Sequence, residues 1–229
     1  MNVARDCDNV ATLLSGKLMD HRDELKQLLR RRSLVLGQIK LSSGKMSDYY
    51  LDCKLTTMDP RGAVLTGFTI LETLDERGIE ADAIGGPEIG AIPIVTAVAA
   101  VSSIRDEQGI GRPLPAFLVR KTPKEHGRQK GIEGIDLEEL KKLRRVVIVD
   151  EVCTGGDSIG IALTAVEKIP ELKVVAVVSL VDREEGGGEK LRARYKERYI
   201  PIFTASELLR NEGQERQTTA GRERVSAGR

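Results

Sequence analysis

Two short apolar runs without polar alternation, residues 145–149 and 174–181, limit the possible folds of this chain more than any other feature of its sequence. A strand with one face in water alternates apolar and polar residues, so these runs are expected to be strands covered on both faces. A helical pattern over 157–169 separates them, and the whole unit has the length of a right-handed crossover between parallel strands. We therefore expect an α/β fold with a central, mostly parallel sheet and helices on both faces.

Capping residues, turn residues and apolar spacing predict the elements on either side of this unit. Asp59 and Pro60 are typical of a helix start, and Gly78 of a helix end. Thr204 and Glu207 have the spacing of a capping box. The other expected elements are an amphipathic helix from 20 to 32, a hairpin over 37–55 with its turn at 42–44, a strand at 81–84, a Gly-Gly-Pro turn at 85–87, an apolar helix to about 101, strands at 115–120 and 199–203, and a closing helix through 210.

The chain has 229 residues, a length that favours one elaborated domain. We expect this domain to cover 1–210, with an N-terminal helix and a small hood at about 20–58 and a core at about 59–210. After residue 210 the only strongly apolar residue is Val225, so 211–229 is expected to be a flexible polar tail.

Composition argues against two classes of partner. With 36 Lys and Arg against 35 Asp and Glu, the net charge of +1 supplies no field that would draw the chain to nucleic acid or to an anionic membrane. Aromatic residues make up 3% of the chain and Trp is absent, so aromatic platforms for single-stranded nucleic acid are not available. The apolar runs are shorter than the ~20 residues of a membrane span. We expect neither a nucleic-acid nor a membrane partner.

The cysteines indicate a reducing compartment. Cys7, Cys53 and Cys153 are an odd number at wide spacings, which argues against a disulfide scaffold and against a zinc site. The first residues include Asp6 and Asp8 and lack the basic and apolar stretches of a secretion signal. The expected location is the cytoplasm.

Residues 146–158, which read VVIVDEVCTGGDS, carry the strongest chemical signal in the chain. An apolar strand leads into Asp150 and Glu151, and a glycine-rich loop then enters a helix, which is where open parallel sheets bind ligands. Glycines let loop amides face a phosphate, the helix N-terminus adds partial positive charge, and Thr154 and Ser158 offer hydroxyl donors. The two acids can accept hydrogen bonds from ribose hydroxyls or hold water around a magnesium ion.

The plain alternative for this segment is an ordinary strand-to-helix turn with Asp157 or Ser158 as its cap. An acidic pair directly before a glycine-rich turn is uncommon, which favours a binding site. The segment is not a P-loop, because no Gly-Lys-Ser/Thr follows, and its glycine spacing is not that of a dinucleotide fingerprint.

The same segment resembles the phosphoribosyl pyrophosphate (PRPP) motif of type I phosphoribosyltransferases. In that motif four apolar residues, two acids, two apolar residues and a small-residue phosphate loop follow one another. This chain departs from it at Glu151, where Asp is usual, at Cys153, where an aliphatic residue is usual, and at Gly155, where a small hydroxyl residue or Ala is commoner. The residues that the resemblance assigns to PRPP here are Asp150, Glu151, Val152, Cys153, Thr154, Gly155, Gly156, Asp157 and Ser158.

Two further segments resemble parts of the orotate phosphoribosyltransferase family. Residues 120–127, Arg-Lys-Thr-Pro-Lys-Glu-His-Gly, resemble its catalytic loop, whose cations neutralise pyrophosphate. Taken alone, this stretch is also typical of a solvated charged loop. Residues 182–187 resemble the segment whose Arg, here Arg183, meets the orotate carboxylate, and a guanidinium suits a planar carboxylate. The pyrophosphate ligands implied here are Arg120, Lys121, Lys124 and His126.

The hairpin and the Gly-Gly-Pro segment extend the resemblance. Residues 41–50 resemble the family's N-terminal hairpin, which encloses the pyrimidine, and this implies that Tyr49 and Tyr50, with Thr154, contact orotate. Paired tyrosines on a half-buried strand are also common without a ligand. Residues 85–90 resemble the family's second pyrophosphate loop.

The resemblance covers about residues 34–209 and implies a specific enzymatic reaction. Orotate and PRPP would give orotidine 5'-monophosphate and pyrophosphate, in pyrimidine synthesis. Magnesium would be bound mainly through the substrate, and two copies of the chain would form a homodimer that shares the catalytic loop. The residues expected to carry catalysis are Lys121, His126, Asp150 and Glu151.

Two alternatives remain at this point. One is a phosphoribosyltransferase for another base, such as a purine, which Arg183 and the tyrosine hairpin argue against. The other is a non-catalytic regulator that keeps the PRPP pocket, an idea that Glu151, Gly155 and Asp157 motivate.

Overall fold

The computed structural model describes residues 20–40, 44, 46–121 and 131–210 of the chain. Its centre is a six-stranded sheet with the strand order β5-β4-β3-β6-β7-β8. Neighbouring strands from β4 to β8 are parallel, and β5 runs antiparallel to β4. The strands are β3 (Ala83–Pro87), β4 (Ala116–Val119), β5 (Ile132–Glu133), β6 (Arg145–Cys153), β7 (Lys173–Asp182) and β8 (Tyr199–Thr204). The predicted α/β fold with a mostly parallel sheet is confirmed.

The two apolar runs of the sequence form the central strands β6 and β7, and α7 (Asp157–Glu167) connects them. Successive side chains of β6 enter different apolar clusters: Val147 and Val149 belong to one, Val146 and Ile148 to the other. This is the alternation of a strand covered on both faces. The crossover unit is therefore the core of the fold, as its sequence predicts.

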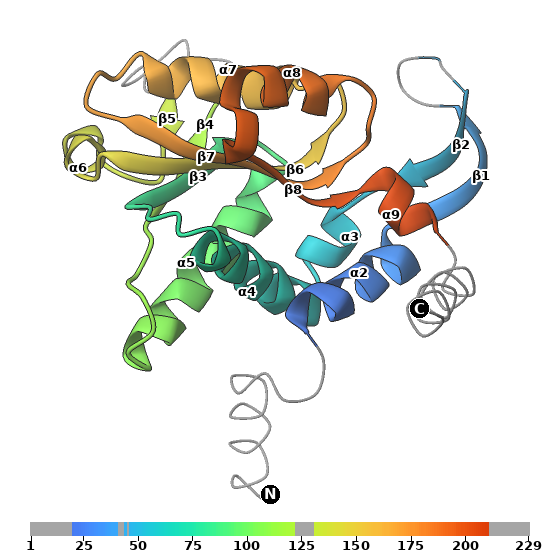
Figure 1. The fold of residues 1–229 in the computed structure, drawn as a ribbon, viewed down its shortest axis with the longest axis horizontal. Coiled ribbons are helices and arrows are strands. Elements are labelled where there is room, and N and C mark those ends of the chain that lie inside the picture. Colours follow the sequence, from blue (N-terminus) through green and yellow to red (C-terminus); the bar gives the residue numbers. More distant parts are fainter. Residues whose placement is uncertain (1–19, 41–43, 45, 122–130, 211–229) are drawn as a thin grey trace, which may run out of the picture.

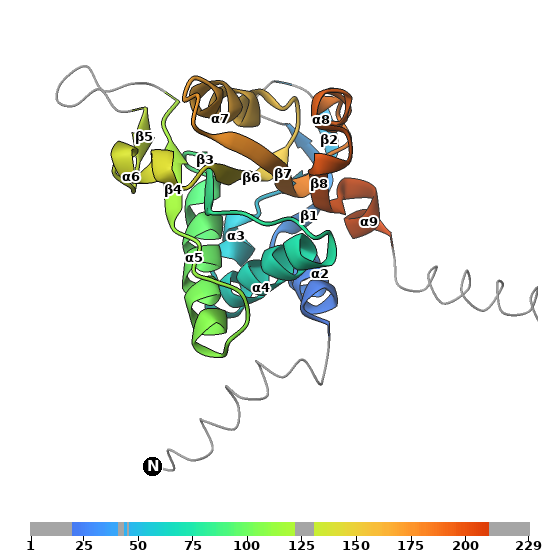
Figure 2. The same cartoon turned by 60° about the vertical axis from the view of Figure 1, so that its left-hand side comes forward.

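Helices cover both faces of the sheet, as Figures 1 and 2 show. The helices on one face are α7 and α8 (Gly187–Tyr195), and those on the other are α4 (Pro60–Glu76) and α5 (Ala91–Glu107), with α2 (His21–Arg32) packed against α4. Asp59 caps α4 as expected, since its carboxylate accepts from Arg61 N and Gly62 N at 3.0 Å each. Short helices α6 (Leu137–Lys142) and η1 (Lys196–Arg198) complete the core.

A separate hairpin stands beside this core. Strands β1 (Leu34–Lys40) and β2 (Met46–Leu51) pair antiparallel in a two-stranded sheet of their own, and α3 (Lys54–Thr57) follows. The predicted hairpin is confirmed and begins earlier than its expected start at 37. Most of the expected turn, residues 42 and 43, lies outside the described residues. We call β1, β2 and α3 the hood.

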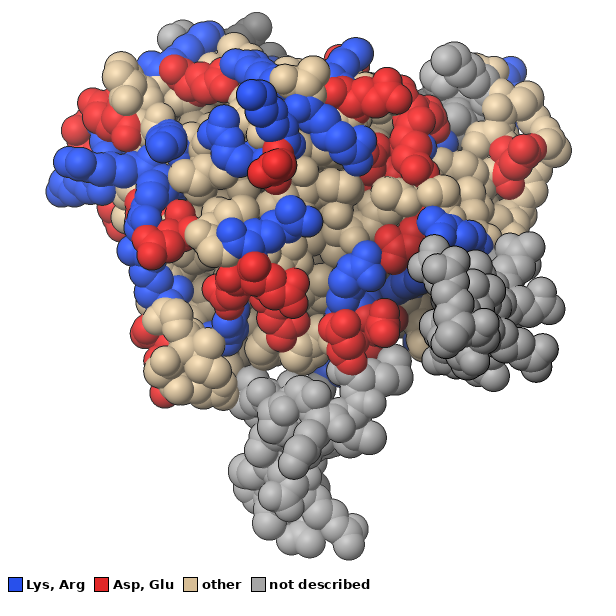
Figure 3. All heavy atoms as spheres, viewed as in Figure 1, with Lys and Arg blue, Asp and Glu red and all other residues tan. Residues whose placement is uncertain are grey.

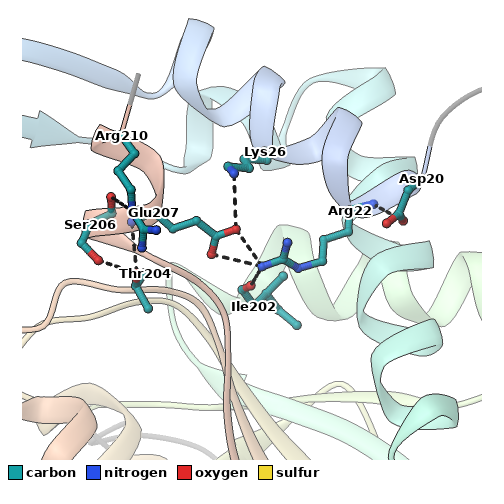
Figure 4. A network of polar contacts seen from close by, with 8 residues as sticks. All are labelled: Asp20, Arg22, Lys26, Ile202, Thr204, Ser206, Glu207 and Arg210. Atoms are coloured by element: carbon teal, nitrogen blue, oxygen red, sulfur yellow. Dashed lines mark hydrogen bonds and ion pairs between the residues drawn. The ribbon is translucent and has the colours of Figure 1, made fainter. Parts of the chain in front are cut away.

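A polar network closes the fold by joining α2 to α9 (Ala205–Leu209), the last described helix (Figure 4). Arg22 Nη2 donates to Ile202 O and to Glu207 Oε1, both at 2.9 Å, and its guanidinium lies 4.7 Å from the centre of the Phe203 ring. Thr204 caps α9 by accepting from Glu207 N at 3.1 Å. Half of the capping-box geometry is thus present, while the Glu207 carboxylate pairs with α2.

The Gly-Gly-Pro turn predicted at 85–87 is wrong, because these residues form the end of β3. A Cβ on Gly85 would lie 2.2 Å from the Phe117 ring, and one on Gly86 would lie 2.0 Å from Val149 O. The glycines therefore allow close packing between neighbouring strands instead of a change of direction. Helices α3, α6 and α8 were not expected, since they are short or lack a continuous apolar face; α8, for example, buries few large side chains, chiefly Leu191 and Tyr195.

The surface agrees with the balanced composition. On the face drawn in Figure 3, acidic and basic side chains are interspersed, with no extended region of one sign. None of the helices in the described part of the chain has both the length and the apolar character needed to cross a bilayer.

Candidate active site

The acid pair lies inside β6, near the edge of the sheet where the parallel strands end, which we call the carboxyl edge. The strand, expected to end in the two acids, continues beyond them, because the ladder with β7 runs through Asp150 and on to Cys153. Asp150 is 5% exposed, and its Oδ1 accepts from Glu151 N at 2.8 Å. Burial, with a smaller contribution from the Glu151 charge, raises the pKa of Asp150 to about 7 against the effect of this hydrogen bond. The strand thus presents a partly protonated carboxyl group.

The glycine-rich loop after β6 surrounds a small cavity. Asp150, Val152 and Ile159 line about 160 Å³ of space together with the loop residues Thr154, Gly155, Gly156, Asp157 and Ser158. Gly156 has φ +84° and is the N-cap of α7, with no side-chain cap. The alternative of a turn capped by Asp157 or Ser158 is therefore wrong. The first-turn amides of α7 stay available to an anion.

The start of α8 packs against the backbone of this loop. Gly187 N donates to Thr154 O at 2.9 Å, and a Cβ on Gly187 would lie 2.4 Å from the same oxygen and 2.7 Å from Gly156 N. Such contact between two backbones requires glycine at position 187. A Cβ on Gly155 would lie 3.2 Å from Asp157 Oδ2, so a carboxylate stands beside the loop.

A larger cavity of about 870 Å³ runs along α7 and shares Lys121, Gly155 and Gly156 with this region. Its walls are mainly apolar and neither Asp150 nor Glu151 lines it. Of the two acids, Asp150 lines the small cavity at the loop, and neither lines the larger one.

Lys54 is the residue at this site that sequence reasoning missed. Its Nζ lies 2.7 Å from Asp52 Oδ1 and 3.1 Å from Glu151 Oε1. Although partial burial lowers the pKa of Lys54, the carboxylates of Asp52 and Glu151 raise it on balance, so the amine is charged. The only sequence signal is an acid and a lysine directly after the hairpin. This pattern does not predict a contact with Glu151, which lies 97 residues further along the chain.

The loop after β3 contacts the acid pair, and the end of β4 is joined to that loop. A Cβ on Gly90 would lie 2.6 Å from Glu151 Cγ, so this backbone is in contact with the Glu151 side chain. Lys121 N donates to Glu88 Oε1 at 3.2 Å, which joins the end of β4 to the same loop. The segment 85–90 therefore borders the acid pair, where its resemblance to a pyrophosphate loop requires it to be.

The basic segment is only partly described. Arg120 Nη1 pairs with Glu133 Oε1 at 3.2 Å, across the antiparallel β4–β5 pair. Lys121 has an exposed side chain whose charge opposes the rise in the pKa of Asp150. Lys124 and His126 lie outside the described residues.

Arg183 lies directly after β7, and its side chain is 9% exposed. Its guanidinium carbon is 4.9 Å from the centre of the Tyr49 ring. Nη2 lies 2.8 Å from Glu185 Oε1, which makes an ion pair without hydrogen-bond geometry. Neither Nε nor Nη2 has a hydrogen-bond partner among the described residues. Arg183 N donates to Cys153 O at 2.9 Å, which fixes the backbone beside the glycine-rich loop. A buried guanidinium with free donors is a ready carboxylate site.

The structure separates the two tyrosines of the hood. Neighbouring residues of a strand face opposite sides, so Tyr49 turns toward Arg183 while Tyr50, paired with Val35, is 43% exposed on the other side. Tyr50 is not brought to this site.

Val152 and Cys153 pack into the core. Val152 lies against one apolar cluster, and Cys153, fully buried, belongs to the other. Burial raises the pKa of the Cys153 thiol, which keeps it protonated and unreactive.

Asp150 and Glu151 could also face a metal ion. Within the described ranges, no cluster of three or more His, Cys, Asp or Glu side chains has the geometry of a metal site. Mg²⁺ usually keeps several waters and binds through one or two carboxylates together with substrate phosphates. The donor set here fits a magnesium ion carried by a phosphorylated substrate.

The strand order explains how distant segments meet. Along the carboxyl edge, β4 supplies Lys121, β3 the loop around Gly90, β6 the two acids with the glycine-rich loop, and β7 Arg183. Cations, hydroxyl acceptors, a phosphate loop and a carboxylate site thus follow one another across neighbouring strands. This arrangement suits a phosphorylated sugar joined to an acidic planar group.

Known proteins share both sequence and fold with this chain, although no family model matches it. An orotate phosphoribosyltransferase from Bradyrhizobium sp. strain BTAi1 is 42% identical over 174 residues, which cover 75% of this chain and 89% of that protein. The structure of Mycobacterium tuberculosis orotate phosphoribosyltransferase in complex with Fe(III) dicitrate superposes with a TM-score of 0.67, at 34% identity, over 83% of this chain and 100% of that one. The same enzyme in complex with PRPP gives a TM-score of 0.60 at 31% identity over 82% of this chain and 99% of that one.

Proposed function

Because this chain belongs to the orotate phosphoribosyltransferase family, we propose that its carboxyl edge transfers the ribosyl phosphate of PRPP to orotate. The products are orotidine 5'-monophosphate and pyrophosphate, a step of pyrimidine synthesis. The described residues of the edge supply a group for each part of the two substrates.

The observation that carries this proposal is the state of Arg183. The Arg183 side chain is 9% exposed, and its Nε and Nη2 have no hydrogen-bond partner among the described residues, although Nη2 lies in an ion pair with Glu185. Such a guanidinium is costly unless a ligand accepts from these donors. The orotate carboxylate matches them, and the Tyr49 ring beside them gives the pyrimidine an aromatic face. A purine has no carboxylate for Arg183, which favours orotate over the purine alternative.

The ribose and its phosphate fit the neighbouring groups. Asp150 and Glu151 accept hydrogen bonds from the ribose hydroxyls. The loop from Thr154 to Ser158 cradles the 5-phosphate with its amides and hydroxyls, while Val152 and Cys153 hold that loop on the core. Thr154, at the junction, contacts both the phosphate and orotate.

The transfer breaks the bond between the anomeric carbon and the pyrophosphate oxygen, and that oxygen keeps the electron pair. A ring nitrogen of orotate forms the new bond to carbon and releases its proton to the departing pyrophosphate or to water. Positive charge develops on the ribose and negative charge on pyrophosphate, so the acids stabilise the first and cations stabilise the second. Arg120 and Lys121 are the described cations, and Lys124 and His126 are proposed to join them.

Magnesium is proposed to arrive with PRPP, held by substrate oxygens and water beside Asp150 and Glu151. When bound, it neutralises charge on the pyrophosphate. The residues of the chain bind and orient the substrates around it.

A homodimer is proposed from the family resemblance, together with exposed apolar side chains in the hood, just after it and around the start of α5. The apolar residues involved are Leu36, Met46, Tyr50, Leu55, Met58, Ile89 and Ile92. Met58 and Ile89 are 71% and 69% exposed, and exposed apolar residues in such number are typical of an interface. In the family resemblance the catalytic loop completes the partner's site, which gives this interface its catalytic role.

We further propose that residues 1–210 form the catalytic domain. The tail expected at 211–229 lies outside the described residues. The two described cysteines, Cys53 and Cys153, are buried free thiols, which suits a reducing compartment such as the cytoplasm.

The test is an orotate-depletion assay with PRPP and magnesium, repeated with adenine and hypoxanthine in place of orotate. Loss of orotate together with release of pyrophosphate is the expected result. Depletion of a purine alone would support the other-base alternative. Binding of PRPP by calorimetry without pyrophosphate release for any base would support the regulator, which Asp157 beside the loop still motivates.

A further inference from the structure

We infer that Lys54 is a positioning residue for the acid pair: it clamps Glu151 for the ribose hydroxyls and ties that carboxylate to the hood. This inference rests on the proposed function and extends it to a residue outside the PRPP motif.

The contacts place Lys54 between two carboxylates that come from different parts of the fold. Its Nζ lies 2.7 Å from Asp52 Oδ1 in the hood and 3.1 Å from Glu151 Oε1 in β6. The Asp52 carboxylate also accepts from Lys54 N at 3.1 Å, which holds the start of α3. The ammonium therefore bridges the hood and the central sheet.

Glu151 needs such a clamp because of its length. Glu has one more methylene than the Asp that is usual here, and the additional torsion gives its carboxylate more possible positions. Gly90 leaves room on one side, since a Cβ there would lie 2.6 Å from Glu151 Cγ. Lys54 holds Oε1 on another side, while Oε2 is buried without a partner among the described residues. One oxygen is thus fixed, and the other is the acceptor left for a substrate hydroxyl.

Lys54 also balances charge at the acid pair. The charged groups that face Asp150 are Glu151 on its own strand, Lys121 at the end of β4 and Lys54 in α3. The Cys53 thiol lies close by, and burial raises its pKa, so it stays neutral. Two adjacent carboxylates repel one another, and Lys54 offsets that repulsion. Without Lys54, the pKa of Asp150 is expected to rise above its value of about 7.

The bridge joins the two substrate positions. Lys54 follows β2, which carries Tyr49 against Arg183, while its amine holds the proposed ribose acid. A shift of the hood is therefore transmitted to Glu151 through a single side chain. Lys54 is therefore expected to affect PRPP binding without contacting PRPP itself.

The experiment compares Lys54→Met, Lys54→Arg and the control Lys141→Met by steady-state kinetics, across a pH series, with a melting temperature for each variant. Lys141 forms a comparable pair with Glu138 Oε1 at 2.8 Å, on α6 and away from the site. For Lys54→Met we expect the KM for PRPP to rise about tenfold, with a smaller change in kcat, because a charge-assisted contact to a binding group is lost. The acid limb of kcat/KM should move to higher pH. Lys54→Arg should recover most of both effects, and Lys141→Met should show neither.

A wild-type KM and pH profile in Lys54→Met would overturn the inference. So would equal losses in Lys54→Met and Lys54→Arg that follow a lowered melting temperature, since these indicate a structural role. If the unmodified protein does not deplete orotate, the proposed function fails by itself. Calorimetry of PRPP binding then decides on Lys54: affinity weakened at least fivefold in Lys54→Met supports the clamp, and equal affinity rejects it.

Discussion

The two ends of the substrate site are built in different ways. The ribose-phosphate end, formed by β6 and the loop after it, lies on a central strand of the sheet that is buried from Val146 to Asp150. The base end, formed by Arg183 and Tyr49, depends on a two-stranded hairpin outside that sheet. In the proposed function the phosphate contacts at the first end are mainly backbone amides, whereas the orotate contacts at the second end are side chains. A change of substrate base is therefore structurally easier than a change of the sugar phosphate.

The difference has a physical origin. Backbone amides at a helix start have directions set by the fold, and glycine contacts such as that of Gly187 with Thr154 leave no freedom to rearrange. A side chain such as Tyr49 can be replaced without moving the strand that carries it. If this contrast is right, substitutions at the base end change orotate kinetics selectively, and those at the ribose-phosphate end change PRPP binding and stability together.

The largest selective effect is expected for Arg183→Met. Loss of a buried guanidinium that binds a carboxylate costs about 2–4 kcal/mol, so kcat/KM for orotate should fall about 30-fold to 10³-fold. PRPP affinity by calorimetry should change little, and Arg194→Met, at an exposed ion pair with Glu167, serves as control. Parallel losses for both substrates would remove the contrast between the two ends.

A comparable loss without base selectivity is expected for Gly187→Ala. The added Cβ would meet Thr154 O at 2.4 Å, so the loop must shift. A shift of about 1 Å costs about a hundredfold in rate, and overpacking destabilises by about 1–3 kcal/mol. Gly160→Ala in α7 is the matched control, because a Cβ there meets nothing within 4 Å and Ala favours the helix. Steady-state kinetics and thermal melting measure both, and similar behaviour of the two variants would speak against a rigid loop.

A smaller effect separates the two tyrosines. Tyr49→Leu should lower kcat/KM for orotate about tenfold, because it removes the aromatic face beside Arg183. Tyr50→Leu, on the opposite side of the strand, should leave the orotate KM within about twofold. Kinetics with varied orotate at saturating PRPP provide the comparison. Equal effects would restore the original expectation that both tyrosines contact the base.

The smallest effects concern pH at the ribose-phosphate end. The pKa of Asp150 is raised by burial to about 7 from an ordinary value of 3.8, so the native state holds a proton between these values that the unfolded state releases. Stability therefore falls as pH rises from about 4 to 7, and Asp150→Asn should raise the melting temperature by a few degrees at pH 8 but not at pH 4. In the unmodified protein, kcat/KM for PRPP should decline below about pH 7 as the carboxylate protonates. If stability rose from about pH 4 to 7, or if kcat/KM for PRPP increased below about pH 7, the interpretation of Asp150 as a buried, functional acid would be contradicted.

Local patterns were enough to predict the ribose-phosphate end. Its apolar strand, acids, glycines and helix are contiguous over 146–158, so their relation in space follows from secondary structure alone. The central strands and the cap of α4 were predictable for the same reason.

Contacts between distant segments were not predictable from one sequence. The bridge from Lys54 to Glu151 spans 97 residues, and nothing in either local pattern names the other. The Gly-Gly-Pro segment suggests a turn by composition, while the Phe117 ring that explains Gly85 belongs to another strand. The separation of Tyr49 from Tyr50 was predictable in principle from strand alternation.

The network around Arg22 also bears on how the protein is made. Arg22 reaches Glu207 across 185 residues of sequence, so a ribosome must synthesise α9 before this anchor for α2 exists (Figure 4). Strands β3 to β7 of the central sheet emerge earlier, whereas α2, which leads into the hood, receives this attachment only after α9 has been synthesised. A nascent chain that lacks α9 would therefore carry an assembled phosphate loop while its base-binding wall is still loosely held.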